Sequence, residues 1–372
     1  MKKITRVLQI VLFIVLLLAP NVLFWLFRDR VDTTNYEKRT LAPFPAINIS
    51  AWADFPGDFD AYVNDNAAFK NQFVQLYSLV NLRLFHMVES DQTLLGEDQW
   101  LFNRSGHSLE DYQAADYYSE EELIQILDTM IRVRDYYAAL DIDFVVFLAP
   151  NKEQIYGEYM PDDIEVYSEY KRLDQIVDYI RDNSDVTVVY PKEELLAAKD
   201  EFQVYYKYDS HWNNVGAFIA AQQLIEATGG QRTDLADLSV VNTGPRSGDL
   251  AQLCNLSNVL NDDNLLAVAG YLEGVPVSII EESSDHNFTR AQSTGLDDRT
   301  LLMIRDSFGA VMMPYLERYY QNTIFVHRDA YSIDFIDKYQ PDIVVYQVVE
   351  RLNSDVFLND NQFPDIIVGA YE

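Results

Sequence analysis

The sequence predicts an α/β fold in which a parallel β-sheet carries helices on both faces. Two observations support it. From about residue 120 onward, short runs rich in Val, Ile and Leu alternate with longer segments of helical periodicity. These runs are continuously apolar, which is typical of strands that are buried on both faces. Strand–helix alternation with short connections then indicates parallel strands with covering helices.

The individual elements follow from the same patterns. The expected strands are residues 143–150, 185–191, 300–306, 322–327 and 342–349. The expected helices are residues 120–140, 168–183, 214–227, 310–321 and 331–340. Residues 232–299 interrupt the alternation and are expected to form an inserted region of loops with a small β element. Because ligands of such sheets bind beyond the carboxyl ends of the strands, functional residues are sought there.

Composition limits the possible partners. The chain has 372 residues with 59 acidic and 28 basic side chains, for a net charge of −31. Such a surface repels nucleic acid, and neutral or cationic glycans approach it more easily than polyanionic ones. The single cysteine, Cys254, excludes an internal disulfide and a cysteine-rich metal site.

The N-terminus predicts a membrane anchor. Lys2, Lys3 and Arg6 precede the apolar run 7–27, which is long enough to cross the hydrocarbon core as a helix. The basic start favours a cytoplasmic N-terminus, with the rest of the chain outside the cell membrane. A cleaved signal peptide is the alternative, but the run is long and shows no small-x-small cleavage site. We therefore expect a single-pass protein with an extracytoplasmic domain.

Three parts are expected along the chain. Residues 1–30 would form the anchor, and residues 31–60, rich in proline and aromatic residues, a stalk. Residues 61–372 would form the α/β domain, including the insertion at about 232–299.

A serine stands where a predicted strand leads into a helix. Ser307 lies in TLLMIRDSFG, residues 300–309. A hydroxyl at such a turn is exposed at the sheet edge, and N–H groups of the helix start can stabilise an oxyanion. Serine also caps helices well. This position alone therefore leaves both a nucleophile and a helix cap open.

An aspartate and a histidine could activate that serine. Asp209 and His211 lie in YYKYDSHWNN, residues 205–214, just before a predicted helix. Two residues apart in extended backbone, they project from the same side, so the carboxylate can orient the imidazole that accepts a serine proton. A local structural hydrogen bond is an alternative, as is half of a metal site. We predict no metal and no cofactor, because no further His or carboxylate cluster has convincing metal spacing.

These segments resemble the AlgX/AlgJ-like family of SGNH-type O-acetyltransferases, the DHHW-type bacterial exopolysaccharide acetylation proteins. Five stretches in family order carry the resemblance, and they are LLGEDQWLFN (94–103), LAPNKEQIYGEYMP (148–161), DSHWN (209–213), SGDLAQL (247–253) and RDSFG (305–309). The resemblance implies an SGNH-hydrolase-like fold with a permuted motif order, in which the Asp–His pair precedes the serine. One departure is Arg305, which stands where ordinary SGNH enzymes have glycine.

The resemblance also implies roles and partners. Ser307 would be the nucleophile, His211 the general base and Asp209 the orienting carboxylate. The implied activity is acetyl transfer, through an acyl-serine, to an extracellular or cell-wall polysaccharide. A membrane-bound acyltransferase of the MBOAT type would supply the acetyl group. The alternatives are an SGNH-type carbohydrate esterase and a non-catalytic polysaccharide-binding assembly subunit.

Three further residues are weaker candidates. Asn151 and Lys152 follow the strand 143–150 and could line the pocket or donate to an oxyanion, although a polar turn at a strand end is the simpler interpretation. Arg328 in HRD, residues 327–329, could contact an anionic sugar or polarise an ester.

Overall fold

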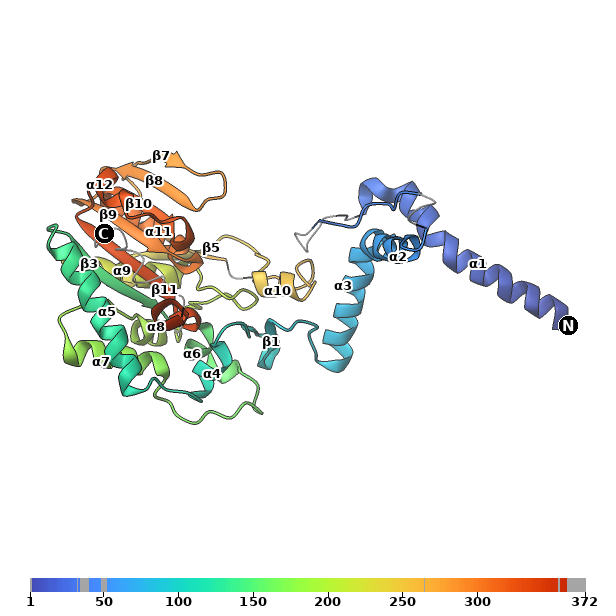
Figure 1. The fold of residues 1–372 in the computed structure, drawn as a ribbon, viewed down its shortest axis with the longest axis horizontal. Helices are drawn as coiled ribbons and strands as arrows, with labels where there is room; N and C mark the ends of the chain where they lie inside the picture. The colour runs from blue at the N-terminus through green and yellow to red at the C-terminus, as the bar shows by residue number, and fades with distance from the viewer. Residues whose placement is uncertain are drawn as a thin grey trace. The chain divides into compact units, whose positions relative to one another are not determined.

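The computed structural model describes residues 2–31, 33, 40–47, 52–263, 265–353 and 355–359. The chain forms two compact units, residues 1–89 and 90–372. The second unit contains the predicted α/β domain (Figure 1). Residues 61–89 belong to the first unit rather than to the unit with the large sheet.

A seven-stranded sheet organises the second unit, in the order β4-β3-β11-β9-β10-β8-β7. Five neighbouring strands run parallel, and each overlaps a predicted segment. They are β3 (Asp143–Ala149), β4 (Thr187–Val189), β9 (Asp297–Arg305), β10 (Tyr320–His327) and β11 (Ile343–Val349). Strands β3 and β11 are almost wholly buried, as continuous apolar runs require.

Two antiparallel strands extend this sheet beyond the prediction. They are β7 (Val277–Glu282) and β8 (Phe288–Ser293), which pair with each other and, through β8, with β10. Both lie in the predicted insertion, which also forms the small sheet of β5 (Ser239–Asn242) and β6 (Leu266–Ala269). Strand β7 is mostly exposed at the sheet edge, so its sequence lacks the apolar run that marks the buried strands.

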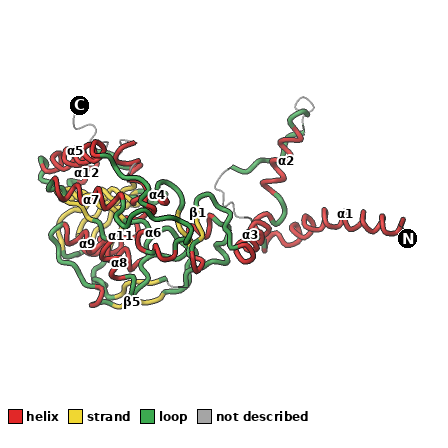
Figure 2. Tube along the Cα trace, turned by 90° about the horizontal axis from the view of Figure 1, so that it is seen from below, coloured by secondary structure: helices red, strands yellow, loops and turns green. Residues whose placement is uncertain are grey.

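Helices cover both faces of the sheet, as predicted (Figure 2). One face carries α5 (Glu120–Ala138), α7 (Arg172–Asn183) and α12 (Asp334–Tyr339). The other face carries α8 (Lys192–Ala198), α9 (Asn214–Ala227) and α11 (Ser307–Tyr319). Alternate residues of one strand enter the two cores, as Val145 and Val146 of β3 do.

Shorter elements surround the carboxyl end of the sheet. They are β1 (Thr93–Leu95), β2 (Leu101–Asn103), α4 (Ser108–Gln113), α6 (Lys152–Ile155) and α10 (Asp249–Leu253). Strands β1 and β2 pair antiparallel, and the amide of Leu101 in β2 donates to the carbonyl of Lys207 at 3.1 Å.

The first unit is helical where it is described. It contains α1 (Lys2–Phe27), α2 (Phe55–Asn66) and α3 (Lys70–Val80), and a π-helical turn, η3 (Asn81–Phe85), continues α3. The segment Thr5–Arg30 is long and apolar enough to cross a membrane. The predicted stalk lies partly outside the described residues, and its end forms the start of α2.

Candidate active site

Ser307 opens helix α11 directly after strand β9. Asp306, and not Ser307, caps this helix, because its Oδ1 accepts the amide of Phe308 at 2.8 Å. The side chain of Ser307 is therefore not used as a cap, and Ser307 is exposed. This placement presents the hydroxyl at the carboxyl end of the central strands.

Strand β11 holds the turn around Ser307 in place. Gln347 Oε1 accepts the amides of Asp306 at 3.0 Å and Gly309 at 3.1 Å. The second carboxylate oxygen of Asp306 accepts the amide of Val349 at 2.7 Å. A Cβ at Gly309 would lie 2.6 Å from Gln347 Oε1, so only glycine fits at this close approach. The turn is thus fixed by buried hydrogen bonds rather than by its own sequence alone.

A continuous hydrogen-bond chain joins Ser307, His211 and Asp209. His211 Nε2 lies 2.7 Å from Ser307 Oγ, and His211 Nδ1 lies 2.7 Å from Asp209 Oδ1. Because a carboxylate only accepts, Nδ1 carries the proton in this arrangement and Nε2 can accept from the hydroxyl. The fold therefore brings together three side chains that lie up to 98 positions apart in the sequence.

Aromatic residues hold the segment before α9 against the turn around Ser307. The segment before α9 folds back on itself, with a bridge between Tyr205 and Trp212. The indole of Trp212 donates to the carbonyl of Phe308 at 3.1 Å, directly after Ser307. Asn213 then caps α9 by accepting two amides. Tyr205, Tyr206 and Trp212 are buried core residues, whereas Tyr208 is half-buried.

Asp209 is held in its ionised form. Burial alone would raise its pKa, but hydrogen bonds and charge from His211, together with the guanidinium of Arg246, bring the pKa well below its usual range. A depressed folded-state pKa means that this carboxylate stabilises the fold above its ordinary pKa. That contribution is lost only as the pH falls through the depressed value. Mild acid should leave Asp209 charged.

Arg246 and Asp249 also belong to this site, and the sequence interpretation did not assign them. Asp209 Oδ2 accepts the amide of Asp249 at 3.2 Å and lies 3.5 Å from Arg246 Nη2. Asp249 Oδ2 lies 3.5 Å from His211 Nδ1 and accepts the Ser210 hydroxyl at 2.6 Å. The signal was present, since both residues fall in or beside the stretch SGDLAQL. Their contacts with Asp209 and His211 form only in the folded chain, so no spacing along the sequence indicates them.

Asp209, His211 and Asp249 also have the donor types and the proximity of a metal site. Their ligand atoms lie within 4.8 Å of one another. Arg246 faces Asp209, and Ser210 donates to both oxygens of Asp249, so both carboxylates have hydrogen-bond or ion-pair partners within the protein. The chemistry of the group is that of a charge network around the imidazole.

Lys152 lies beneath this network. It is 1% exposed, and its Nζ donates to the backbone carbonyls of Leu101, Tyr206 (3.2 Å) and Asp209 (2.8 Å). A fourth carbonyl, that of Lys207, lies at 3.3 Å. Burial lowers the pKa of Lys152 to about 8. The ammonium therefore ties together the backbone that carries Asp209, instead of lining a pocket.

Replacing Lys152 by methionine should destabilise the fold. Methionine fills a similar volume but leaves the buried carbonyls without their donor, at about 1–3 kcal/mol for each buried group. We expect a loss of about 3 kcal/mol or more in the free energy of unfolding. Urea denaturation of the full chain measures this. Lys338→Met, on the exposed side of α12, is the matched control and should be nearly neutral; equal stability of both variants would contradict this role.

Asn151 remains a candidate donor. The backbone N–H of Asn151 donates to Glu350 Oε2 at 2.7 Å, and its side-chain Oδ1 accepts from Arg351 at 3.3 Å. The side chain is fully buried, and its Nδ2 has no hydrogen-bond partner in the part of the chain that the structure describes. The Arg351 guanidinium lies over the ring of Phe308, 5.3 Å from its centroid. Asn151 is thus connected to the Ser307 turn through one side chain.

Arg328 and Arg305 lie at the ends of β10 and β9. Arg328 Nε is 3.5 Å from Asp329 Oδ1, and its buried Nε and Nη1 lack hydrogen-bond partners among the described residues. Among the described residues, no hydrogen bond or ion pair joins Arg328 to Ser307, His211 or Asp209. Arg305 is buried and donates to the carbonyl of His286 at 2.8 Å, within the β7–β8 connection. The antiparallel extension of the sheet therefore provides a partner for Arg305, at the position where ordinary SGNH enzymes have glycine.

Two buried glutamates behind the site should make stability depend on pH. Burial raises the pKa of Glu153 to about 7 and that of Glu350 well above its usual range. A raised folded-state pKa favours the fold below the ordinary glutamate pKa, and this benefit is lost as the pH rises through about 7. The melting temperature should therefore fall between about pH 5 and pH 8.

Glu153→Gln tests this expectation, because an amide does not titrate. The variant should show a flatter dependence of melting temperature on pH in differential scanning calorimetry. Glu121→Gln on the exposed first turn of α5 should leave the wild-type slope unchanged. A slope that persists in Glu153→Gln would refute the role of this carboxyl.

The chain also resembles known proteins. Residues 93–268 match the family described as the SGNH hydrolase-like domain of the acetyltransferase AlgX. This stretch is similar to an AlgX-type domain. The match contains Asp209, His211 and Asp249, whereas Ser307 follows it in the sequence. The resemblance inferred from the motifs, and with it the SGNH-like fold class, is confirmed.

Individual proteins are also similar to this chain, in sequence or in fold. The probable alginate O-acetylase AlgJ of Pseudomonas putida is 28% identical over 192 residues, covering 48% of this chain and 46% of that protein. The similarity thus spans about half the length of the curated relative. PatB1 of Bacillus cereus has a TM-score of 0.50 at 16% identity, over 70% of this chain and 97% of PatB1. A DHHW family protein of Eubacterium siraeum has a TM-score of 0.53 at 14% identity, over 74% and 96%, respectively. Both structures share the fold.

Proposed function

We propose that the protein is a serine-dependent O-acetyltransferase that modifies a polysaccharide. The observation that supports this most directly is the hydrogen-bond chain from Ser307 Oγ through His211 to Asp209, at 2.7 Å for each step. It ends in an exposed hydroxyl at the carboxyl edge of the sheet, where a donor and an acceptor can approach. The family match and the relative named as an O-acetylase agree with acetyl transfer.

In the first step, Ser307 Oγ attacks the carbonyl carbon of an acetyl ester or thioester donor. The hydroxyl proton passes to His211 Nε2, and the resulting imidazolium is stabilised by Asp209. When the tetrahedral intermediate collapses, the donor's leaving oxygen or sulfur takes that proton from His211. Ser307 is left as an acetyl ester.

In the second step, a sugar hydroxyl attacks the acetyl-serine. His211 Nε2 accepts the sugar's proton as the new carbon–oxygen bond forms, and the proton returns to Ser307 Oγ as the serine ester breaks. The free enzyme is regenerated and the sugar carries the acetyl group. Atoms and charges balance with no cofactor.

Two groups are proposed to stabilise the oxyanion of each step. The amide of Ser307 stands at the start of α11 and donates to no acceptor in the described part of the chain. The buried Nδ2 of Asn151 also lacks a partner there. Donors that are already oriented and desolvated stabilise developing charge more than solvent does. Arg328 is proposed as a contact for an anionic group of donor or acceptor, since two of its buried nitrogens have no hydrogen-bond partner among the described residues.

The setting of the reaction is also proposed. Helix α1 would anchor the protein in the cell membrane, with the α/β domain outside the cytoplasm. Acetyl donors are made in the cytoplasm, so a membrane-bound acyltransferase of the MBOAT type would pass the acetyl group to Ser307. The acceptor would be an extracellular or cell-wall polysaccharide. The net charge of −31 favours a neutral or cationic polymer.

A chromogenic acetyl ester distinguishes transfer from hydrolysis. Detergent-solubilised full chain is given the ester with and without a neutral oligosaccharide, and products are identified by mass spectrometry. Faster ester cleavage with acetylated sugar supports the transferase. Acetate as the sole product supports an esterase that uses the same three residues. An unmodified Ser307 after treatment with a serine-directed sulfonyl probe, with glycan binding intact, would support a non-catalytic subunit.

A further inference from the structure

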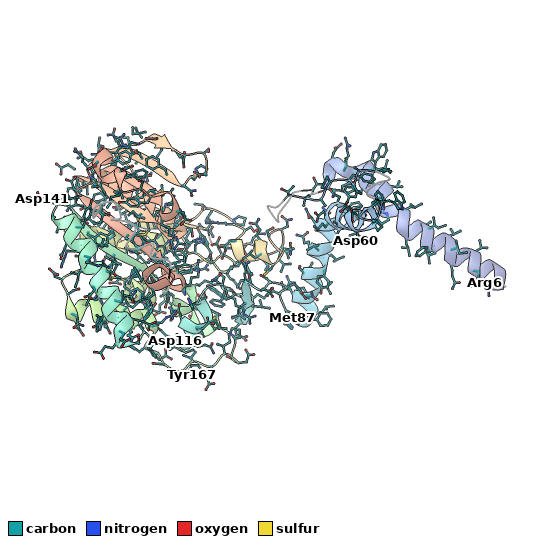
Figure 3. All side chains as sticks on the ribbon, viewed as in Figure 1. Arg6, Asp60, Met87, Asp116, Asp141 and Tyr167 are labelled. Atoms are coloured by element: carbon teal, nitrogen blue, oxygen red, sulfur yellow. The ribbon has the colours of Figure 1, made fainter. Side chains whose placement is uncertain are left out.

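Helix α3 and the π-helical turn that continues it expose an apolar face. Leu76 is 55% exposed and Leu84 is 70% exposed. The spacing of the exposed apolar residues along the chain is i, i+3, i+4, i+7 and i+11, which places them on one side of a helix. These residues, here called the α3 face, are Phe73, Leu76, Tyr77, Val80 and Leu84. Figure 3 labels Met87, which is also exposed, just beyond this segment.

The inward side of the same segment is more polar than its outer side. Ser78 and Asn81 are buried, next to the buried Leu82. A surface helix of a water-soluble domain shows the opposite arrangement, with its apolar stripe facing the core. Exposed apolar faces of this kind mark contacts with a membrane or with another protein. The α3 face therefore requires an apolar partner.

Contact with α1 places this face near a bilayer. The ring of Phe24, in the last turns of the apolar helix, meets the ring of Phe69 edge-on with centroids 5.7 Å apart. Phe69 directly precedes α3. If Thr5–Arg30 spans the membrane, its outer end and the start of α3 lie at the same depth, at the boundary between hydrocarbon and headgroups.

The charge of the segment fits a lipid surface. The chain has 59 acidic residues, yet none falls between residues 66 and 88. That interval instead contains Lys70, Arg83 and His86. Basic residues beside an apolar helix face are attracted to anionic headgroups, while acidic residues would be repelled.

We propose that α3 and η3 lie in the surface of the outer leaflet, with the α3 face in contact with lipid. This inference rests on the proposed membrane anchoring by α1. The membrane would then hold the first unit by two elements, one that crosses the bilayer and one that lies on it. Anchoring at two points would limit the rotation of the first unit about α1.

Spin-label accessibility tests the proposal on the full-length chain. Leu76→Cys and Leu84→Cys are labelled after reconstitution in vesicles of phosphatidylethanolamine and phosphatidylglycerol. The accessibility of each spin label is then measured with two relaxing reagents. One is oxygen, which partitions into lipid, and the other is a water-soluble nickel chelate. Ile124→Cys is the matched control, because Ile124 is an exposed apolar residue on α5 of the second unit. The native Cys254 is buried and should remain unlabelled, which the unsubstituted chain verifies.

The ratio of oxygen to nickel accessibility should be several-fold higher at Leu76 and Leu84 than at Ile124. Labels at the α3 face that are open to nickel would overturn the proposal. Labels shielded from both reagents would also overturn it, because they would indicate a protein contact. Leu16→Cys in α1 separates the two hypotheses, since a nickel-accessible label there would refute the anchor itself. A lipid-embedded Leu16 with nickel-accessible Leu76 would refute only the interfacial helix.

Discussion

Ser307→Ala should abolish acetyl transfer while leaving the fold intact. The exposed hydroxyl makes its close contact with His211 Nε2 and does not cap α11, since Asp306 performs that task. Removing a nucleophilic serine from a Ser–His–Asp arrangement lowers kcat by about 10⁶-fold in a well-studied protease, and we expect at least about 10³-fold here. Acetyl-ester content of the polymer, measured on cells that carry the variant, reports the effect.

Ser119→Ala is the control for this experiment. Ser119 caps α5, and its hydroxyl and amide form a capping box with Glu122. Its loss should lower stability by about 1 kcal/mol without affecting transfer. Mass spectrometry of the wild type incubated with donor should also show one acetyl group on the peptide containing Ser307. Unchanged polymer acetylation in Ser307→Ala would show that its contact with His211 is structural.

Asp209→Asn should cause a comparably large loss. The amide retains the shape of the carboxylate but cannot stabilise an imidazolium, and its NH₂ group favours the wrong tautomer of His211. The equivalent change in a protease triad lowers kcat by about 10⁴-fold, and we expect a loss of that order. Rates of chromogenic ester cleavage by the full chain, measured against pH, provide the test.

Asp249→Asn distinguishes the contribution of Asp249 to activity from that of Asp209. Its oxygen lies 3.5 Å from Nδ1, compared with 2.7 Å for Asp209, and its side chain is 41% exposed. A partly solvated charge at that distance contributes about 1 kcal/mol, so we expect activity to fall by about fivefold. A larger loss in Asp249→Asn than in Asp209→Asn would reverse the roles proposed for them.

The sequence predicted the parallel part of the sheet well because buried strands must be apolar throughout. Strands β3 and β11 coincide with their predicted segments to within one residue. The antiparallel strands β7 and β8 were not predicted individually within the insertion. Strand β7, at the sheet edge, is largely exposed, and it joins the sheet only through β8, which pairs with β10. Lys152 lies beneath Asp209, and its contacts are with backbone carbonyls, which leave no pattern in the sequence.

The sequence by itself determined the strand–helix order, the apolar N-terminal helix and the local Asp209-x-His211 pair, because each depends on periodicity or on near neighbours. Only the tertiary structure decided that Ser307 meets His211 and that Arg246 and Asp249 surround Asp209. These contacts join residues that are distant in sequence, and their distances follow from how strands and helices pack. No spacing along the chain encodes them.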